Sequence, residues 1–472
     1  MAAASAPARG AWLALGAVLL ALAAVALVEG ADYSDLRGDY CARSRGDRKC
    51  CRDRRDDCSV PILGTLCYCD EFCNRTRNED CCPDYWAHCL GMEPPPQLVF
   101  GCRHEGRDLR VGQSFKINCN LCTCSVAGGA GPEVLCETAA CMVEPEVIRG
   151  VNARHDAGAI GWRAANHSAF WGRRLDEGLS LRLGTLQPQR TVRRMRPIRR
   201  WENHGSRIPS HFDARRRWQG RITPVRDQGW CGASWALSTA AVASDRFAIM
   251  SVGEEHPALA PMHLLACNTR GQRGCGGGYL DRAWFFTRKY GLVDDDCYPY
   301  SAQQGHVGAC RLPLHTTLQA AGCRAPQQRV GASPRSALFH TGPPYRLGSE
   351  SDIQAEIMAS GPVQATMKVY HDFFVYKGGV YQQTAQGAGE RAGYHSVRIL
   401  GWGEENTRAG PLKYWLVANS WGEQWGEQGL FRIRRGSNEC EIEDFVLASW
   451  ADTVMPPVEK MKHNGNAHSN VI

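Results

Sequence analysis

The feature that most constrains the fold of this chain is a crowding of cysteine near its N-terminus. Ten of the 23 cysteines lie within residues 41–89, with few large apolar residues between them. A segment this short cannot bury a sufficient hydrophobic core, so we expect disulfides to hold it together. Six more cysteines follow within residues 102–141, after a Pro-rich linker. So many thiols indicate an oxidising, secretory route.

The N-terminus also indicates secretion. Arg9 precedes an apolar run from Ala11 to Val28, which predicts a signal peptide over residues 1–30. An uncleaved anchor is the alternative, because the run is long for a signal peptide. No later stretch is apolar enough to span a bilayer, so we expect no stable membrane insertion of the cleaved chain. Asn74 and Asn166 begin sequons that we expect to be glycosylated.

Both cysteine-rich segments resemble extracellular modules. The run Cys-Tyr-Cys-Asp-Glu-Phe-Cys at 67–73, followed by Cys81 and Cys82, makes residues 31–92 similar to a somatomedin B domain, a binding module without catalytic chemistry. Residues 98–142 are similar to the first half of a von Willebrand factor type C domain. Their C-x-x-C-x-C spacing at 119–124 would also suit zinc. An oxidising compartment favours disulfides for this pattern, so we expect no metal and no cofactor.

Two Arg-Gly-Asp tripeptides lie at the edge of the first module, at Arg37-Gly38-Asp39 and at Arg45-Gly46-Asp47. Arg offers a guanidinium fork and Asp a carboxylate, and Gly lets a turn present both. Integrins recognise this tripeptide, so both copies are candidate integrin-binding sites. The alternative is chance occurrence in an Arg-rich region, because a short motif is only a hypothesis.

Residues 206–452 resemble the mature domain of papain-like cysteine proteases, and of cathepsin B in particular. The run Gln-Gly-Trp-Cys-Gly-Ala-Ser-Trp at 228–235 matches the start of the nucleophile helix. The runs at 393–397 and 419–422 match the histidine and asparagine motifs. The resemblance implies a two-lobed α+β fold, a disulfide between Cys231 and Cys275, and four former catalytic positions: Gln228, Ser234, His395 and Asn419.

The nucleophile position holds Ser234 where the family has cysteine. In active members the thiolate pairs with the histidine, and its pKa falls to about 3–4. A serine hydroxyl is far less acidic, and serine enzymes use a carboxylate, not an amide such as Asn419, to support the histidine. We therefore expect no active catalytic residue. The oxyanion donors, the Gln228 side chain and the Ser234 amide, should persist in a cleft that binds without cleaving.

Residues 143–205 resemble a cathepsin B propeptide, through motifs at 161–164, 170–171 and 183–186. In such zymogens this segment runs through the substrate cleft. It ends in a basic tract from Arg190 to Arg200, with Arg215–Arg217 further on. The tract is a solvated linker, a polyanion site for heparan sulfate, or a cleavage site. Nucleic acid is not expected, because the chain is secreted and lacks an interleaved aromatic platform. A polar tail covers residues 453–472.

Together these parts resemble the tubulointerstitial nephritis antigen family. The resemblance implies a secreted, non-catalytic glycoprotein of the basement membrane and extracellular matrix. Its partners would be integrins and matrix proteins of the laminin or collagen type, and its inactivated protease domain would be a scaffold. Two alternatives stay open. One is a slow serine-type hydrolase, and the other is a decoy that captures peptides or protease inhibitors in the cleft.

Overall fold

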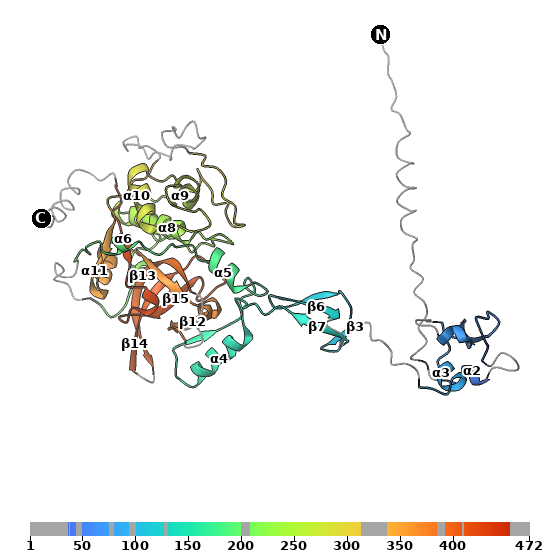
Figure 1. The fold of residues 1–472 in the computed structure, drawn as a ribbon. Coiled ribbons are helices and arrows are strands. Elements are labelled where there is room, and N and C mark those ends of the chain that lie inside the picture. Colours follow the sequence, from blue (N-terminus) through green and yellow to red (C-terminus); the bar gives the residue numbers. More distant parts are fainter. Residues whose placement is uncertain are drawn as a thin grey trace, which may run out of the picture. The chain divides into compact units, whose positions relative to one another are not determined.

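The computed structural model describes residues 36, 38–43, 50–74, 80–93, 101–126, 131–199, 208–312, 338–384, 392–407 and 410–453. The predicted signal peptide, the Arg-Gly-Asp residues Arg37, Arg45, Gly46 and Asp47, and nearly all of the polar tail lie outside these ranges. The chain divides into two compact units, one of residues 1–102 and 126–132 and one of residues 103–125 and 133–472 (Figure 1). Each is described by itself.

The N-terminal unit is built around cystine. Its short elements are α2 (Tyr40–Arg43), β1 (Ser59–Ile62), β2 (Thr65–Tyr68), η2 (Glu71–Asn74) and α3 (Tyr85–Cys89), with β1 antiparallel to β2. All ten cysteines of residues 41–89 are paired, as Cys41–Cys69, Cys50–Cys89, Cys51–Cys58, Cys67–Cys82 and Cys73–Cys81. The buried cluster of this unit consists largely of these cystines, which replace the apolar core that so short a segment cannot build.

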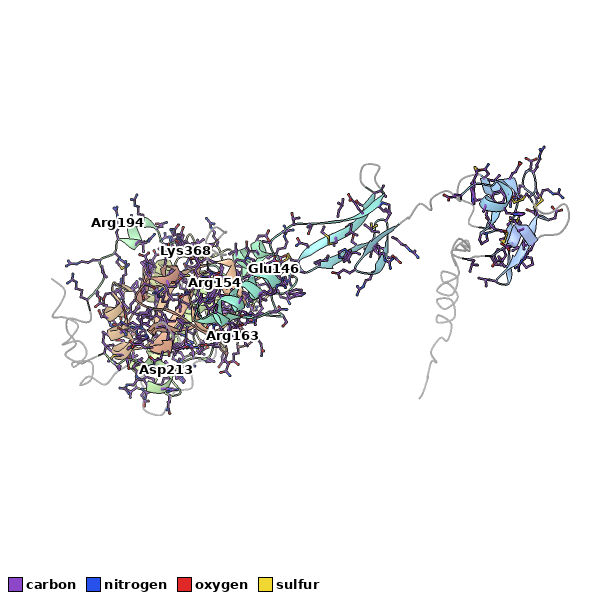
Figure 2. All side chains as sticks on the ribbon, turned by 90° about the horizontal axis from the view of Figure 1, so that it is seen from below. Glu146, Arg154, Arg163, Arg194, Asp213 and Lys368 are labelled. Atoms are coloured by element: carbon purple, nitrogen blue, oxygen red, sulfur yellow. A yellow bond between two sulfur atoms is a disulfide. The ribbon has the colours of Figure 1, made fainter. Side chains whose placement is uncertain are left out.

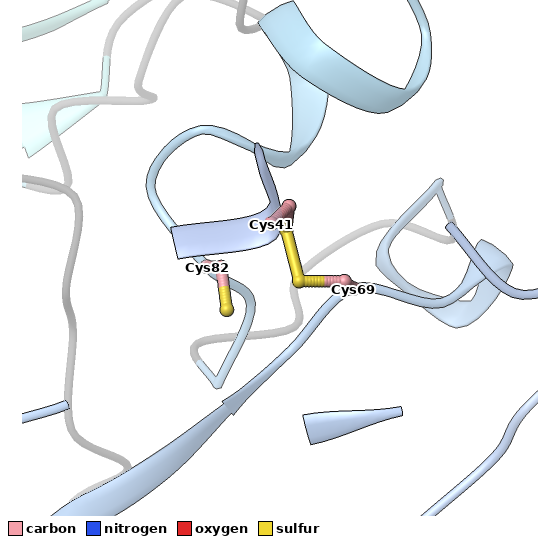
Figure 3. A group of neighbouring side chains, drawn as sticks. All are labelled: Cys41, Cys69 and Cys82. Carbon is pink, nitrogen blue, oxygen red and sulfur yellow. A yellow bond between two sulfur atoms is a disulfide. The ribbon is translucent and has the colours of Figure 1, made fainter. Parts of the chain in front are cut away.

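Three sulfurs of this cluster have a spacing that could suit a metal ion. The Sγ atoms of Cys41, Cys69 and Cys82 lie within 4.8 Å of one another (Figure 3). Each is already bonded, Cys41 to Cys69 and Cys82 to Cys67. Because the thiolate is the form of cysteine that binds metal, these oxidised sulfurs offer no metal site.

The second unit begins with short strands. They are β3 (Gly101–His104, of which residues 103 and 104 belong here), β4 (Arg107–Arg110), β5 (Ser114–Ile117), β6 (Asn120–Val126) and β7 (Pro132–Cys136), and β5 pairs antiparallel with β6. Disulfides join Cys119 to Cys141 and Cys122 to Cys136, and Cys124 is also disulfide-bonded. The C-x-x-C-x-C run at 119–124 is therefore oxidised, as predicted.

The rest of this unit has the predicted two-lobed α+β fold (Figure 1). One lobe packs α8 (Ser234–Met250), α9 (Pro261–Cys267) and α10 (Leu280–Tyr290) around an apolar cluster. Helix α8 is buried along 15 of its 17 residues, and its two buried charges are paired, Asp245 with Arg398 and Arg246 with Glu356. It lies between the helical lobe and the sheet, and contacts α9, α10 and β13. Its first residue, Ser234, therefore sits where the two lobes meet.

The other lobe is a nine-stranded sheet over a second apolar cluster. The strand order is β10-β16-β11-β13-β14-β15-β12-β8, and β9 pairs with β13. The bounds are β8 (Trp162–Ala164), β9 (Phe212–Asp213), β10 (Tyr345–Leu347), β11 (Val363–Val369), β12 (Tyr376–Tyr381), β13 (Gly393–Thr407), β14 (Gly410–Ala418), β15 (Leu430–Arg434) and β16 (Val446–Ala448). Helical pieces α7 (Ala214–Arg217), α11 (Glu350–Ser360), η4 (His371–Val375) and η6 (Glu439–Glu441) complete the lobe.

The propeptide-like segment is part of this body. It forms α4 (Pro145–Asp156), β8, α5 (Leu175–Leu181) and α6 (Arg190–Arg193). Strand β8 extends the sheet by pairing antiparallel with β12. Trp162 of β8 is fully buried in the apolar cluster, and its Nε1 donates a 2.9 Å hydrogen bond to the Gln382 carbonyl. A buried tryptophan of this size contributes on the order of 3 kcal/mol or more to stability, so the segment is firmly docked.

Candidate functional site

The former catalytic positions meet between the lobes. Ser234 begins α8, His395 lies on β13, and Asn419 follows β14. The His395 Nε2 donates a 2.7 Å hydrogen bond to the Asn419 Oδ1. Ser234 and His395 are both fully buried. The fold thus brings together the residues that the motifs predicted, and removes them from solvent.

Burial sets the charge of His395. It lowers the pKa of His395 to about 4, against the opposing effect of the hydrogen bond to Asn419. The ring is therefore neutral at pH 7, with its Nε2 proton directed at Asn419. Among the described residues, no hydrogen-bond partner faces its Nδ1. An active cysteine protease instead keeps this histidine protonated, because the charged imidazolium stabilises the thiolate.

The Ser234 hydroxyl is engaged by another hydroxyl. Its Oγ lies 3.0 Å from the Thr185 Oγ1, and Thr185 itself donates to the Ser396 Oγ at 2.8 Å. Because Thr185 has one proton and gives it to Ser396, the Ser234 proton points to Thr185. A nucleophilic serine would instead donate this proton to the histidine.

The two oxyanion donors are present and already occupied. The Gln228 Nε2 donates to the Leu183 carbonyl at 2.9 Å, and the Ser234 amide donates to the same oxygen at 3.4 Å. The Gln228 side chain is fixed further by the Ser420 hydroxyl, which donates to its Oε1 at 2.7 Å. The sequence predicted that both donors persist, and in the structure both donate to a peptide carbonyl of the same chain.

Residues 183–186 form backbone hydrogen bonds to the turn at 274–278 on one side and to strand β13 on the other. The Gly278 amide donates to the Gly184 carbonyl at 3.0 Å, and the Leu186 amide donates to the Gly278 carbonyl at 2.9 Å. On the other side, the Thr185 amide donates to the Tyr394 carbonyl at 3.1 Å. The glycine-rich turn at 274–278 is therefore lined by a segment of the same chain.

Gly184 makes the close fit possible. Its φ is +113°, and a Cβ at this position would lie 2.0 Å from the carbonyl carbon and oxygen of Gly232. Only glycine tolerates both that backbone conformation and that approach. The segment therefore lies directly against the turn that precedes α8.

Arg182 is a site residue that the motifs did not reveal. Its side chain is only 4% exposed and lies 3.0 Å from Asp227. It donates to the Gly229 carbonyl at 2.7 Å and stacks over the rings of Phe170 and Trp230. The only hint in the sequence is its position directly before the propeptide-like run at 183–186. This buried cation anchors the segment at one end of the cleft.

Several cysteines of the papain-like domain, and the predicted binding and glycosylation residues, lie as follows. Cys231 is joined to Cys275, and Cys267 to Cys310. Cys440 is a buried free thiol. Among the predicted binding and glycosylation residues that the structure describes, Gly38, Asp39, Asn74 and Asn166 are exposed.

The two arginine tracts do not form one surface. Arg215 belongs to α7 and pairs with Asp213, whereas Arg194 follows α6. Figure 2 places Arg194 and Asp213 at opposite edges of the papain-like body. Each tract must therefore be considered separately. No helix of the described residues is long and apolar enough to cross a membrane.

Comparison with known proteins identifies the family. The papain family cysteine protease profile matches residues 208–450. Human tubulointerstitial nephritis antigen-like is 46% identical over 442 residues, which are 91% of each chain. Bovine tubulointerstitial nephritis antigen is 39% identical over 433 residues, or 88% of this chain and 87% of its own.

Solved structures agree on the fold. Procathepsin B from Trypanosoma congolense superposes with a TM-score of 0.54 at 28% identity, and covers 66% of this chain and 100% of its own. A digestive procathepsin of Tenebrio molitor gives a TM-score of 0.52 at 25% identity over 65% of this chain and 89% of its own. Both are proenzymes, in keeping with the docked segment seen here. The chain belongs to the tubulointerstitial nephritis antigen family and carries a papain-like domain.

Proposed function

We propose that this protein is a secreted, non-catalytic glycoprotein of the extracellular matrix that supports cell adhesion, with its papain-like domain as a closed scaffold. One observation carries the proposal. The Leu183 carbonyl accepts hydrogen bonds from the Gln228 side chain and the Ser234 amide, and so takes the place of a substrate carbonyl. A site filled by its own chain, with serine at the nucleophile position, has neither the access nor the thiolate that proteolysis requires.

The alternative of a slow serine hydrolase has little chemical support. The Ser234 proton is directed at Thr185, and His395 is supported by an amide. An amide stabilises the neutral ring but not the imidazolium that forms when histidine takes a proton. The alternative of a peptide-capturing decoy requires the segment to leave the cleft. Arg182 and Trp162 are both buried in its docked position, which opposes release.

The adhesive part of the proposal depends on the N-terminal unit. Asp39 is exposed, as an integrin ligand must be, and Gly38 beside it is also exposed. Asp39→Glu would keep the charge of this side chain but move its carboxylate, so the substitution tests whether the position of the carboxylate matters. We expect Arg45-Gly46-Asp47 to contribute as well. The disulfide-rich modules and the exposed Asn74 and Asn166 suit an extracellular glycoprotein, whose matrix partners would be of the laminin or collagen type.

Two assays test the proposal. The first measures cleavage of a dibasic cathepsin substrate by wild type and by Ser234→Ala. Equal background rates are expected, and wild-type turnover that disappears in Ser234→Ala would overturn the non-catalytic assignment. The second measures cell spreading on wild type, on Asp39→Glu, on Asp47→Glu and on the double variant. Spreading should fall in the double variant, and equal spreading on all four proteins would reject the Arg-Gly-Asp role.

A further inference from the structure

Three arginines of the docked segment have exposed side chains without an ion-pair partner among the described residues. They are Arg190, Arg194 and Arg196. The local sequence offers no compensation, because residues 178–201 contain no Asp or Glu. The positive charge at this edge of the papain-like body is therefore a local excess and not part of an ion-pair network.

The backbone that carries these arginines is held in place. The Arg346 Nη1 donates to the carbonyls of Arg193 and Met195, at 3.0 and 3.3 Å. The Ile198 amide donates to the Arg346 carbonyl at 2.9 Å, and Arg193 pairs with Asp444. The backbone of residues 193–198 is thus tied to the body, while the side chains of the three arginines are exposed. A ligand would find the charges already fixed along the chain, which reduces the entropy lost on binding.

Other arginines of the same unit provide a contrast. Arg149 pairs with Glu146, Arg163 with Asp156, and Arg215 with Asp213. Arg163 and Glu146 lie on the part of the body that is remote from Arg194 (Figure 2). Paired arginines present little net field to a polyanion, so total basic charge is not what distinguishes the Arg190–Arg196 edge.

We propose that Arg190, Arg194 and Arg196 form a binding site for a sulfated glycosaminoglycan. A guanidinium fork donates two hydrogen bonds to a sulfate as it does to a phosphate. A linear polyanion can engage several such forks in series, and a charged polysaccharide is an available partner in the extracellular setting proposed above. The site goes beyond that proposal, because it gives the docked segment a ligand of its own.

The test uses the full-length secreted protein and heparin as the probe. The triple variant Arg190→Ser, Arg194→Ser, Arg196→Ser removes the site. The matched control is Arg149→Ser, Arg163→Ser, Arg215→Ser, which lowers the net charge by the same amount but removes only paired arginines. A third variant, Arg190→Lys, Arg194→Lys, Arg196→Lys, keeps the charge and loses the forks. Equal melting temperatures of the four proteins establish that each is folded.

Wild type and control should bind heparin at physiological salt, and neither should bind hyaluronan, which carries no sulfate. The site variant should bind heparin roughly 100-fold more weakly, at about a factor of five for each arginine. The slope of log Kd against log salt should fall by about 2 to 3, as for phosphate polyanions. The lysine variant should lie between wild type and the site variant.

Several results would overturn the site. If the site variant binds heparin with the same affinity as the control variant, heparin binds elsewhere on the protein. A wild type that binds hyaluronan as tightly as heparin would reject sulfate recognition. If the site variant loses binding to phosphatidylserine vesicles but still binds heparin as the control does, the three arginines bind a membrane surface instead. None of these results bears on the turnover assay, so the site and the non-catalytic assignment can fail separately.

Discussion

The Ser234 hydroxyl donates its proton to the hydroxyl of Thr185, 3.0 Å away, in the cleft where a substrate would meet a nucleophile. The bond is one link in a buried chain of hydroxyls. Thr185 donates to Ser396, which lies 3.0 Å from the Ser238 hydroxyl, and the Gln364 amide donates to Ser238 at 2.6 Å. Ser234 is therefore a structural hydrogen-bonding residue that ties the docked segment to α8 and to the sheet.

Replacement of Thr185 tests this chain of hydroxyls. Thr185→Val keeps the shape of the side chain but leaves the buried Ser234 donor without its partner. An unsatisfied buried hydroxyl costs about 1–3 kcal/mol, so the free energy of unfolding should fall by that amount. Urea unfolding monitored by tryptophan fluorescence measures it. The exposed Thr191→Val is the control and should change little, and equal midpoints for the two variants would contradict the network.

Replacement of Gly184 tests the fit of the segment. Gly184→Ala adds a methyl group that would lie 2.0 Å from backbone atoms of Gly232, so the segment must shift. Gly220→Ala is the matched control, because Gly220 also has a positive φ, of +73°, but has no atom within 4 Å of the added Cβ. Both changes strain the backbone by roughly 1 kcal/mol.

The readout is limited proteolysis of the folded protein by trypsin. Gly184→Ala should be cut after Arg182 faster than wild type, because a displaced segment exposes the neighbouring buried arginine. Gly220→Ala should be cut there at the wild-type rate. If Gly184→Ala resists trypsin as wild type does, the segment is not seated against Gly232 as described.

Two buried histidines make stability depend on pH. Burial lowers the pKa of both His395 and His263 to about 4, below the value of about 6.5 expected in the unfolded chain. Between these values the unfolded state binds more protons, so stability is highest above pH 6.5 and falls as pH falls toward 4. From pH 7 to pH 5 each histidine should remove about 2 kcal/mol.

Urea unfolding at pH 7 and pH 5 checks this loss. The variant His263→Asn should lose about 2 kcal/mol less than wild type between the two pH values. The exposed His256→Asn should lose as much as wild type. If His263→Asn and wild type have the same pH dependence, His263 does not remain neutral in the folded protein.

Cys440 should be an inert thiol. Burial, and then the neighbouring carboxylates of Glu439 and Asp372, raise the pKa of Cys440 well above its usual range. The thiolate is the reactive form, so a maleimide should leave the native protein unlabelled at Cys440 at pH 7. Mass spectrometry after labelling with and without urea tests this. Rapid native labelling would show that Cys440 is accessible to a reactive partner.

The fold was largely predictable, because its signals are local. The runs at 228–235, 393–397 and 419–422 identified the papain-like domain, and the number of cysteines, which indicates an oxidising compartment, predicted disulfides. The positions of Ser234, His395 and Asn419 followed from those motifs. Each motif is a contiguous run, which is why sequence alone could reveal it.

The resemblance implied that a segment runs through the cleft, but the contacts that close the site were not predictable, because they join residues far apart in the sequence. Leu183 meets Gln228 across 45 positions, and Thr185 meets Ser396 across 211. The burial of Arg182 likewise depends on Asp227 and on two aromatic rings, and no motif in the sequence predicted these contacts. The sequence also grouped the arginine tracts together, since it could not show that Asp213 pairs with one of them and that Arg194 lies on another edge.

Hydrogen–deuterium exchange of the whole chain tests the central claim most directly. The claim is that residues 183–186 occupy the cleft, so the amides of Thr185, Leu186 and Ser234 are hydrogen-bonded within it. Peptides that cover 183–186 and the start of α8 should exchange as slowly as the buried strands β11 and β13. Exchange of these peptides at the rate of an unstructured chain, with β11 and β13 still protected, would contradict the account, because the cleft would then be open.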